Sequence, residues 1–190
     1  MSISQDVEIT LKALRSRGLD SRFAENRQVA RKMIIDLVQE NWIVGCGDST
    51  TICSLGVLQD LMDMGNRVLN PFVRLKIMRK KTAMLPLSVM KQTAQGCDVF
   101  LASSNAVTMD GKLVNIDGGG MRVSGMVFGP SLSIIVAGRN KIVKDVDAAL
   151  YRIKNVIAPA HAKTIGPDWG FLAWLAASVW SPKPFVPLGE

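Results

Sequence analysis

Residues 98–130 read DVFLASSNAVTMDGKLVNIDGGGMRVSGMVFGP. The stretch begins with an almost unbroken apolar run at 98–103, which is typical of a strand covered by helices on both faces. Asparagines, aspartates, an arginine and three consecutive glycines then follow within 104–130. Polar and conformationally special residues in an apolar setting lower stability, so their density here indicates a site more readily than packing.

The rest of the chain alternates between two kinds of apolar pattern. Short apolar runs predict further strands, at 42–44, 67–69, 113–116 and 131–137. Helical spacing predicts helices over 3–14, 30–38, 52–62, 76–95 (interrupted at Pro86) and 145–156. The Met109–Lys112 segment is a turn signal, which makes 113–116 the return strand of a hairpin. Strands alternating with helices predict an α/β fold with an open, mostly parallel sheet flanked by helices.

Composition narrows the class of protein. We expect one domain over 1–166 and a different kind of segment over 167–190. No run approaches the ~20 apolar residues of a membrane span, and the N-terminus lacks the apolar core of a signal peptide, so we expect a cytoplasmic protein without a membrane span. The net charge is +7, but aromatics are only 6% and no nucleic-acid-binding motif is present, so no nucleic-acid partner is expected.

The basic residues at 74–81 and the tryptophan-rich stretch at 169–180 each allow two interpretations. The basic residues Arg74, Lys76, Arg79, Lys80 and Lys81 are typical of a solvated helix face, with attraction of an anionic partner as the alternative. Residues 169–180, WGFLAWLAASVW, hold three of the four tryptophans. They either pack on the protein's own core or form an arm that makes a homodimer through 168–180.

Cofactor signals are weak in this chain. The cysteines Cys46, Cys53 and Cys97 form no CxxC pair, and His161 is the only histidine, so no metal or iron–sulfur ligand set is expected. Residues 45–50, GCGDST, join a predicted strand to a predicted helix, yet they match neither GxGxxG nor a P-loop. No nucleotide fingerprint follows from them, and the cofactor stays unknown.

The same loop is nevertheless a candidate anion site. Glycines allow a sharp turn, and the free N–H groups of a helix's first turn suit a phosphate or carboxylate. We therefore predict that Gly45, Gly47, Ser49 and Thr50 bind a ligand. The alternative is a tight turn in which Asp48 or Ser49 only caps the helix.

The 104–130 segment supplies most of the other candidates. Three consecutive glycines form a backbone nest, and Arg122 is placed to grip an anion. Two aspartates are candidate general bases. The predicted catalytic residues are Asp117 and Asp110, and the predicted ligand-binding residues are Asn105, Asn115, Gly118, Gly119, Gly120, Arg122 and Lys141.

Structural interpretations compete for several of these residues. Asp110 is favoured as part of a hairpin turn, whereas Asn105 holding a left-handed turn and Asn115 capping a strand end are about as well supported as binding. In parallel sheets, ligands bind outside the carboxyl ends of the strands. The loops after Val44, Ser103 and Ile116 would then converge on one crevice, and Lys141 would reach the same edge.

The sequence also resembles a known family. VGCGDST at 44–50, SNAVTMDGKLVNIDGGGMRV at 104–123 and IIVAGRNKIV at 134–143 are similar to the LUD-domain family of lactate-utilisation C-type proteins, over about 25–166. The resemblance implies a Rossmann-like fold similar to ribose-5-phosphate isomerase and the CoA transferases. It also implies a part in oxidising lactate to pyruvate, with other lactate-utilisation subunits as partners. Some single-domain members end in a cysteine-containing tail, whereas 165–169 has no cysteine, so direct electron transfer is not expected.

Three functions remain after this comparison. The first is binding of a small anionic metabolite, either a hydroxy or keto acid or a phosphorylated compound, at the glycine-rich crevice. The second is a sugar-phosphate isomerase or CoA-transferase-like enzyme, which needs a carboxylate as its base. The third is a non-catalytic assembly or regulatory subunit that docks through its tail. Whether the protein is an enzyme stays open at this point.

Overall fold

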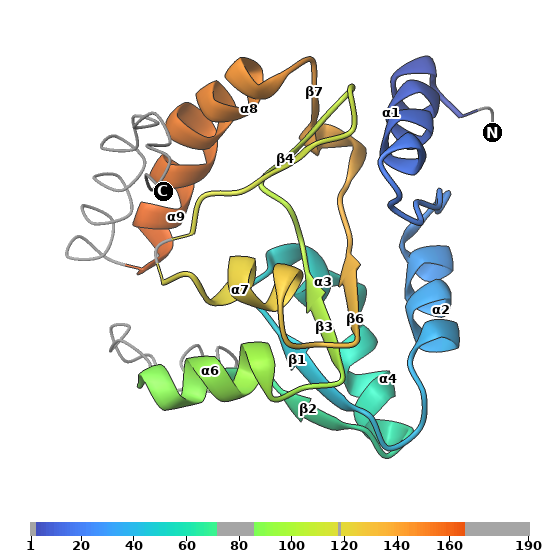
Figure 1. Cartoon of the computed structure of the whole chain (residues 1–190), viewed down its shortest axis with the longest axis vertical. Helices are drawn as coiled ribbons and strands as arrows, with labels where there is room; N and C mark the ends of the chain where they lie inside the picture. Colours follow the sequence, from blue (N-terminus) through green and yellow to red (C-terminus); the bar gives the residue numbers. More distant parts are fainter. Residues whose placement is uncertain (1–2, 72–85, 118, 166–190) are drawn as a thin grey trace, which may run out of the picture.

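A four-stranded parallel sheet forms the centre of the protein (Figure 1). The computed structural model describes residues 3–71, 86–117 and 119–165. The strands lie in the order β2-β1-β3-β6, and every neighbouring pair is parallel. Their bounds are β1 (Ile43–Cys46), β2 (Arg67–Leu69), β3 (Val99–Ala102) and β6 (Leu132–Ile135). The predicted α/β class is therefore confirmed.

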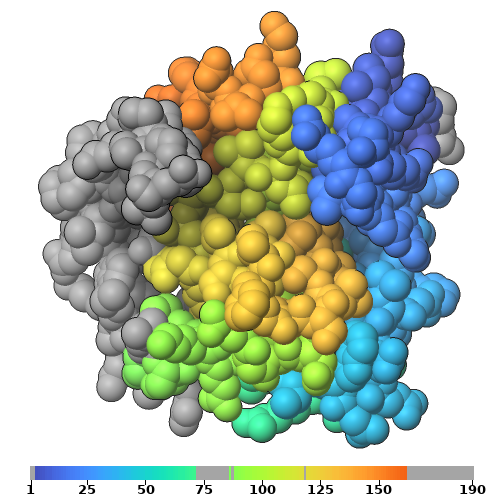
Figure 2. Space-filling model, in the orientation of Figure 1, coloured from blue at the N-terminus to red at the C-terminus, as the bar shows by residue number. Residues whose placement is uncertain are grey.

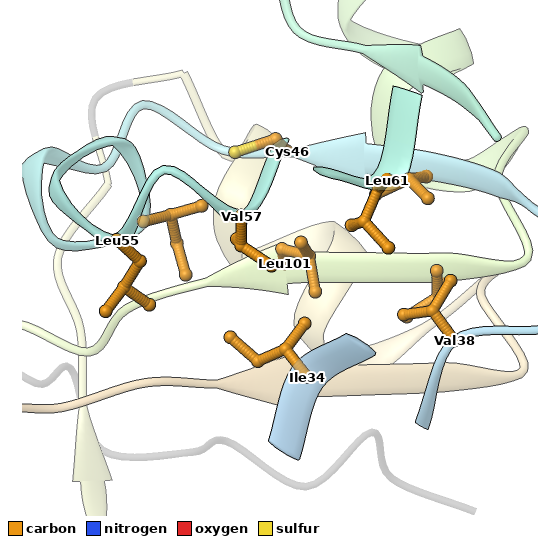
Figure 3. Close-up of a cluster of buried hydrophobic side chains, with 10 residues drawn as sticks. Ile34, Val38, Cys46, Leu55, Val57, Leu61 and Leu101 are labelled. Atoms are coloured by element: carbon orange, nitrogen blue, oxygen red, sulfur yellow. The ribbon is translucent and has the colours of Figure 1, made fainter. Parts of the chain in front are cut away.

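Alternating side chains divide the core between the two faces of this sheet. Cys46 and Leu101 point to one face, where they belong to one buried cluster with Val57 and Ile34 (Figure 3). Phe100 and Ala102 point to the other face. The first face is covered by α2 (Arg27–Leu37), α3 (Thr50–Leu55) and α4 (Val57–Asp63), and the second by α6 (Leu87–Gln95) and α7 (Met121–Val127).

A glycine seats α7 directly on β3. An added Cβ at Gly125 would lie 2.8 Å from the ring carbons of Phe100, which is closer than real Cβ atoms approach. Because Gly125 has no side chain, the helix rests against the aromatic ring. This close contact fixes the height of α7 over the sheet and places its first turn at the carboxyl edge of the strands.

A second, smaller sheet follows β3 in the chain. It has the order β5-β4-β7, with β4 (Ala106–Thr108), β5 (Leu113–Val114) and β7 (Ile142–Val143). The predicted hairpin is present, since β4 and β5 are antiparallel, while β7 is parallel to β4. The sheet lies between α8 (Val146–Arg152) and α1 (Gln5–Ser16) in Figure 1. Residues 103–105 are therefore the short link between the two sheets.

Two predicted helices differ from the structure. The helix expected over 52–62 is two helices, because Gly56 adopts a left-handed conformation with φ +73°. The helix expected over 145–156 continues through a π-helical turn (Ile153–Ile157) into α9 (Ala158–Ile165). Pro159 has no N–H for the usual helical bond, and the wider turn lies directly before it.

Some predictions fall on residues outside those described. They concern the basic residues at 74–81, Gly118, and the tail at 167–190 with its tryptophan-rich stretch, including the proposed homodimer arm. The helix expected over 76–95 is described only from Leu87 onward. Among the described residues, no helix has both the length and the apolar character needed to cross a bilayer.

Candidate functional site

The topology of the large sheet marks one place for a ligand. After β1 the chain forms β2 on one side, and then β3 pairs with β1 on its other side. Open α/β sheets bind ligands outside the carboxyl ends of the strands at such a switch point. Gly47 follows β1 and Ser103 follows β3 there, and the Gly47 N–H donates to the Leu101 carbonyl at 3.1 Å.

Arg122 extends from the first turn of α7 to this edge. Its Nη2 donates to Asn105 Oδ1 at 3.0 Å and to the Ile116 carbonyl at 2.9 Å, and its Nη1 donates to the Ser103 carbonyl at 3.4 Å. An added Cβ at Gly47 would lie 3.7 Å from Arg122 Cβ. The segments after β1, β3 and β5 thus meet around a single arginine side chain, the first at its aliphatic stem and the other two at its guanidinium group.

Lys141 reaches the same link from the opposite direction. It lies at the end of the 3-10 turn η1 (Arg139–Lys141), just before β7. Its Nζ donates to Ser103 Oγ at 2.6 Å, to the Ser104 carbonyl at 3.0 Å and to Thr51 Oγ1 at 3.2 Å. The ammonium group therefore joins the start of α3 to the link between the sheets.

Arg152 supplies a third positive charge, from the last turn of α8. Its Nε donates to the Asn105 carbonyl at 3.3 Å. The carbonyls of three consecutive residues, 103 to 105, therefore each accept a hydrogen bond from a different cation. We call Arg122, Lys141 and Arg152 the cation cluster. In Figure 2 the olive residues of the β4–β5 hairpin meet the yellow residues of α7 on the face turned to the viewer.

The cluster carries positive charge that is compensated only in part. Burial, and then the charges of Arg122 and Arg152, lower the pKa of Lys141 to about 8. Burial also lowers the pKa of Arg122, while Asp117 and Asp48 act to raise it. Within the described part of the chain, none of the three cations has a carboxylate within 4.0 Å.

The glycine nest is filled by a side chain of the protein. Asp117 Oδ2 accepts from the N–H groups of Arg122 at 2.8 Å and Val123 at 3.2 Å, and its Oδ1 accepts from Gly119 at 3.4 Å. The carboxylate therefore caps α7, and Gly120 enters the helix with a left-handed φ of +74°. Of the described glycines in this predicted nest, Gly119 donates to Asp117, and ligand binding at the nest stays a prediction.

Asn105 and Asn115 each use a side-chain oxygen to bind the backbone of the other's segment. Asn105 N–H donates to Asn115 Oδ1 at 3.0 Å, and Ile116 N–H donates to Asn105 Oδ1 at 3.0 Å. They tie the link between the sheets to the end of β5. Because Asn105 Oδ1 also accepts from Arg122, this pair helps to position the cation cluster.

Asp110 lies away from the cluster, in the β4–β5 turn. Its carboxylate accepts hydrogen bonds from Lys112 and Thr108, and it lies 3.8 Å from Arg17 Nη2. Hydrogen bonds from Lys112, then from Thr108, lower the pKa of this exposed carboxyl below its usual value. These contacts agree with the turn interpretation.

The predicted anion-binding segment 45–50, which includes the end of β1, divides into packing and polar positions. At Gly45 an added Cβ would lie 2.2 Å from the Thr93 carbonyl oxygen, so this glycine serves close packing. Ser49 Oγ accepts from the Ile52 N–H at 3.2 Å and caps α3, whereas Thr50 is exposed. The hydroxyl that reaches the cluster belongs to Thr51.

Sequence reasoning included Arg122 and Lys141 but missed three residues of this site. Thr51 is one position beyond the predicted loop, and Ser103 looked like the end of a strand. Arg152 lies inside the predicted final helix, where a lone arginine is normally a solvated residue. The one sequence feature near it is Pro159: Arg152 ends α8, the helix that follows β7, and directly precedes the π-helical turn before that proline.

No metal centre accompanies the cation cluster in the described residues, where no group of three or more His, Cys, Asp or Glu is arranged to hold an ion. A groove of about 190 Å³ runs between α6 and α7. Met90, Ala94 and Met121 line it beside Gly119 and Gly120. It adjoins the glycine-rich segment.

The parallel sheet, its switch point and the polar link beside it define an α/β domain with a candidate site at the carboxyl edge of the strands. The chain belongs to the LUD-domain family, whose family model matches residues 7–168. The LUD domain is associated with lactate-utilisation proteins. Comparisons with curated proteins and with solved structures found no match.

Proposed function

We propose that this LUD-domain protein binds a small anionic metabolite at the cation cluster and serves as a component of lactate utilisation. The observation that carries the proposal is the convergence of Arg122, Lys141 and Arg152 on three consecutive carbonyls at the switch point. The ligand would be a hydroxy or keto acid or a phosphorylated compound. The proposal extends to a cytoplasmic location and to other lactate-utilisation subunits as partners.

The electrostatics support an anion at this position. Like charges that are partly removed from water repel one another, and this repulsion contributes to the lowered pKa of Lys141. A bound anion would stabilise all three cations at once. Neutral carbonyl and hydroxyl oxygens satisfy the hydrogen bonds of the cluster, but they do not neutralise its charge.

The enzyme alternative has less support from the site. A sugar-phosphate isomerase or an acyl transferase needs a carboxylate placed to accept a proton from its substrate. Asp117 is a predicted base whose charge acts on Arg122, yet its two oxygens accept three backbone N–H groups around the start of α7. Binding is therefore the function that the geometry supports best.

A thermal-shift screen at pH 7 tests the proposal. Lactate, pyruvate and inorganic phosphate are each added to the full chain, with sodium chloride at equal ionic strength as the reference. A ligand at ten times its dissociation constant should raise the melting temperature by about 3–6 °C. Arg152→Met and Lys141→Gln should each reduce the shift.

Arg139→Met is the matched control. Arg139 lies two residues before Lys141, is exposed and pairs with Asp6 rather than with the cluster, so its loss should leave the shift unchanged. A melting temperature that no anion raises would contradict the proposal. An equal shift of the melting temperature in wild type and in both cluster variants would show that the anion binds at another surface.

A further inference from the structure

The hydroxyl hydrogen of Thr51 has no acceptor among the described residues. Its Oγ1 accepts a hydrogen bond from Lys141 Nζ at 3.2 Å. A hydroxyl group has a single hydrogen, and an oxygen that accepts from an ammonium group directs its own hydrogen elsewhere. Within the described part of the chain, Thr51 Oγ1 donates no hydrogen bond. The hydroxyl is therefore poised to donate to a ligand.

Arg152 offers donors in the same neighbourhood. Its Nε is bound to the Asn105 carbonyl, whereas its two Nη atoms make no hydrogen bond among the described residues. The three N–H groups of Lys141 are already engaged with Thr51, Ser103 and Ser104. Thr51 and Arg152 are thus the donors available to a ligand, and Lys141 supplies charge while it holds Thr51 in place.

The positive charge that no carboxylate offsets lies at Lys141 and Arg152. Asp117 and Asp48 act on Arg122, but neither carboxylate is among the groups that influence Lys141. The groups around Lys141 are the cations Arg122 of α7 and Arg152 of α8 and the hydroxyls of Thr51 and Ser103. A monocarboxylate would neutralise one of the two positive charges. A phosphoryl group carries about −1.5 to −2 at pH 7 and would neutralise both.

We infer that the site takes a phosphoryl dianion, held by Thr51 Oγ1 and the terminal nitrogens of Arg152 in front of Lys141. This inference rests on the proposed function and narrows its ligand from any small anion to a phosphorylated compound. A phosphoryl group also offers three terminal oxygens to the donors of Thr51 on α3 and Arg152 on α8, whereas a carboxylate offers two. Thr51 is then a ligand-binding residue, and Lys141 is a positioning residue.

Proton uptake by Lys141 on phosphate binding distinguishes the inferred role of this residue from a purely structural one. A dianion next to Lys141 favours its charged form and raises its lowered pKa. At pH 8 to 9 inorganic phosphate is already a dianion, so binding should take up a proton at Lys141. The affinity for phosphate should therefore fall as pH rises from 8 to 9.5.

Isothermal titration calorimetry on the full chain compares inorganic phosphate, a phosphate monoester such as glycerol 3-phosphate, and lactate. Titrations at pH 8.5 in two buffers of different ionisation enthalpy count the protons taken up. We expect either phosphoryl compound to bind about tenfold or more tightly than lactate, which corresponds to one strong charge-assisted hydrogen bond. A monoester that binds more tightly than free phosphate would identify an esterified ligand.

Variants locate the binding. Thr51→Val keeps the shape of the side chain and should weaken phosphate binding about tenfold, whereas Ser54→Ala on the same helix should not. Lys141→Gln should abolish proton uptake, and Lys144→Gln, three residues further on and exposed, should preserve it. Unfolding in urea identifies any variant that has lost its fold.

Each outcome separates the two proposals. Lactate binding as tightly as phosphate, or Thr51→Val with unchanged phosphate affinity, would overturn the phosphoryl assignment and leave the anion site in place. Failure of every anion to bind the folded protein would overturn both the assignment and the proposed function.

Discussion

Gly47 lies against Arg122: an added Cβ at Gly47 would be 3.7 Å from the Cβ and Cγ atoms of the arginine. The contact joins the end of β1 to the start of α7, which are separated by more than seventy residues of chain. The distance is an ordinary van der Waals contact, so the arginine leaves room for a Cβ at this position. Gly45, two residues earlier in β1, is packed much more closely.

Gly45→Ala and Gly47→Ala should therefore differ in stability. At Gly45 the new methyl group would lie 2.2 Å from the Thr93 carbonyl and 2.6 Å from Cys97 Sγ, so α6 must shift. We expect the free energy of unfolding in urea to fall by about 1–3 kcal/mol. Gly47→Ala makes only contacts of 3.5 Å and longer, and should change stability by less than about 1 kcal/mol. Equal losses in the two variants would contradict this packing account.

Arg122→Met should destabilise the fold as well as the site. The substitution keeps the aliphatic stem but removes the donor to the Ser103 and Ile116 carbonyls and one of the two donors to Asn105 Oδ1. We expect a loss of about 2–3 kcal/mol in the free energy of unfolding, measured in urea. Arg139→Met removes an exposed ion pair and should cost about 1 kcal/mol or less. A small loss at position 122 would mean that the guanidinium is held for its ligand alone.

Two substitutions at Asp117 distinguish a role in capping α7 from a role in proton transfer. Asp117→Ala removes the side chain that accepts from the first turn of α7, and should lower stability by about 1 kcal/mol. Asp117→Asn keeps an acceptor oxygen and should retain both the stability and the anion affinity of the wild type. Any turnover found for this protein should survive Asp117→Asn. Turnover that disappears while anion affinity is retained would reinstate Asp117 as a general base.

The pH dependence of stability should report on Lys141. In the unfolded chain its pKa returns to the ordinary 10.5, whereas the folded value is about 8. Between these values the unfolded state binds more protons than the native state, so the free energy of unfolding rises with pH. Wild type should therefore gain stability relative to Lys141→Met as pH increases from 8 to 10.5. Urea denaturation at intervals of pH measures the difference, and a constant difference would show that Lys141 titrates normally.

Much of the fold could be predicted because its signals are local. The buried strand at 99–102 is a continuous apolar run, and the Asp110–Gly111 turn lies between two short strand patterns. The break at Gly56 is harder to foresee, because helical spacing continues across it and only the left-handed backbone separates α3 from α4. The π-helical turn before Pro159 was not predicted for a similar reason, because the apolar pattern continues through it.

The site was predictable only in part, for a reason of geometry. Arg122 and Lys141 stand beside glycine-containing loops, and such loops indicate a site from the sequence. Arg152 and Thr51 lie on helices, and their importance depends on packing between α8, α3 and the link between the sheets. Asp117 stays a predicted catalytic residue, and the structure adds a contact that its sequence context did not indicate, since its carboxylate caps α7. Long-range proximity is what a single sequence does not display.

A crystal grown with selenate tests the central claim most directly, because selenate is a tetrahedral dianion whose selenium is located by anomalous scattering. We expect an anomalous peak at the cation cluster, within hydrogen-bond distance of Thr51 Oγ1 and the Arg152 guanidinium. The peak should be absent from crystals of Arg152→Met that retain the fold. The contradicting result is well-occupied selenate at other surfaces and none at the cluster, in a crystal whose packing leaves the cluster accessible to solvent. Such a result would mean that these three cations do not form an anion site.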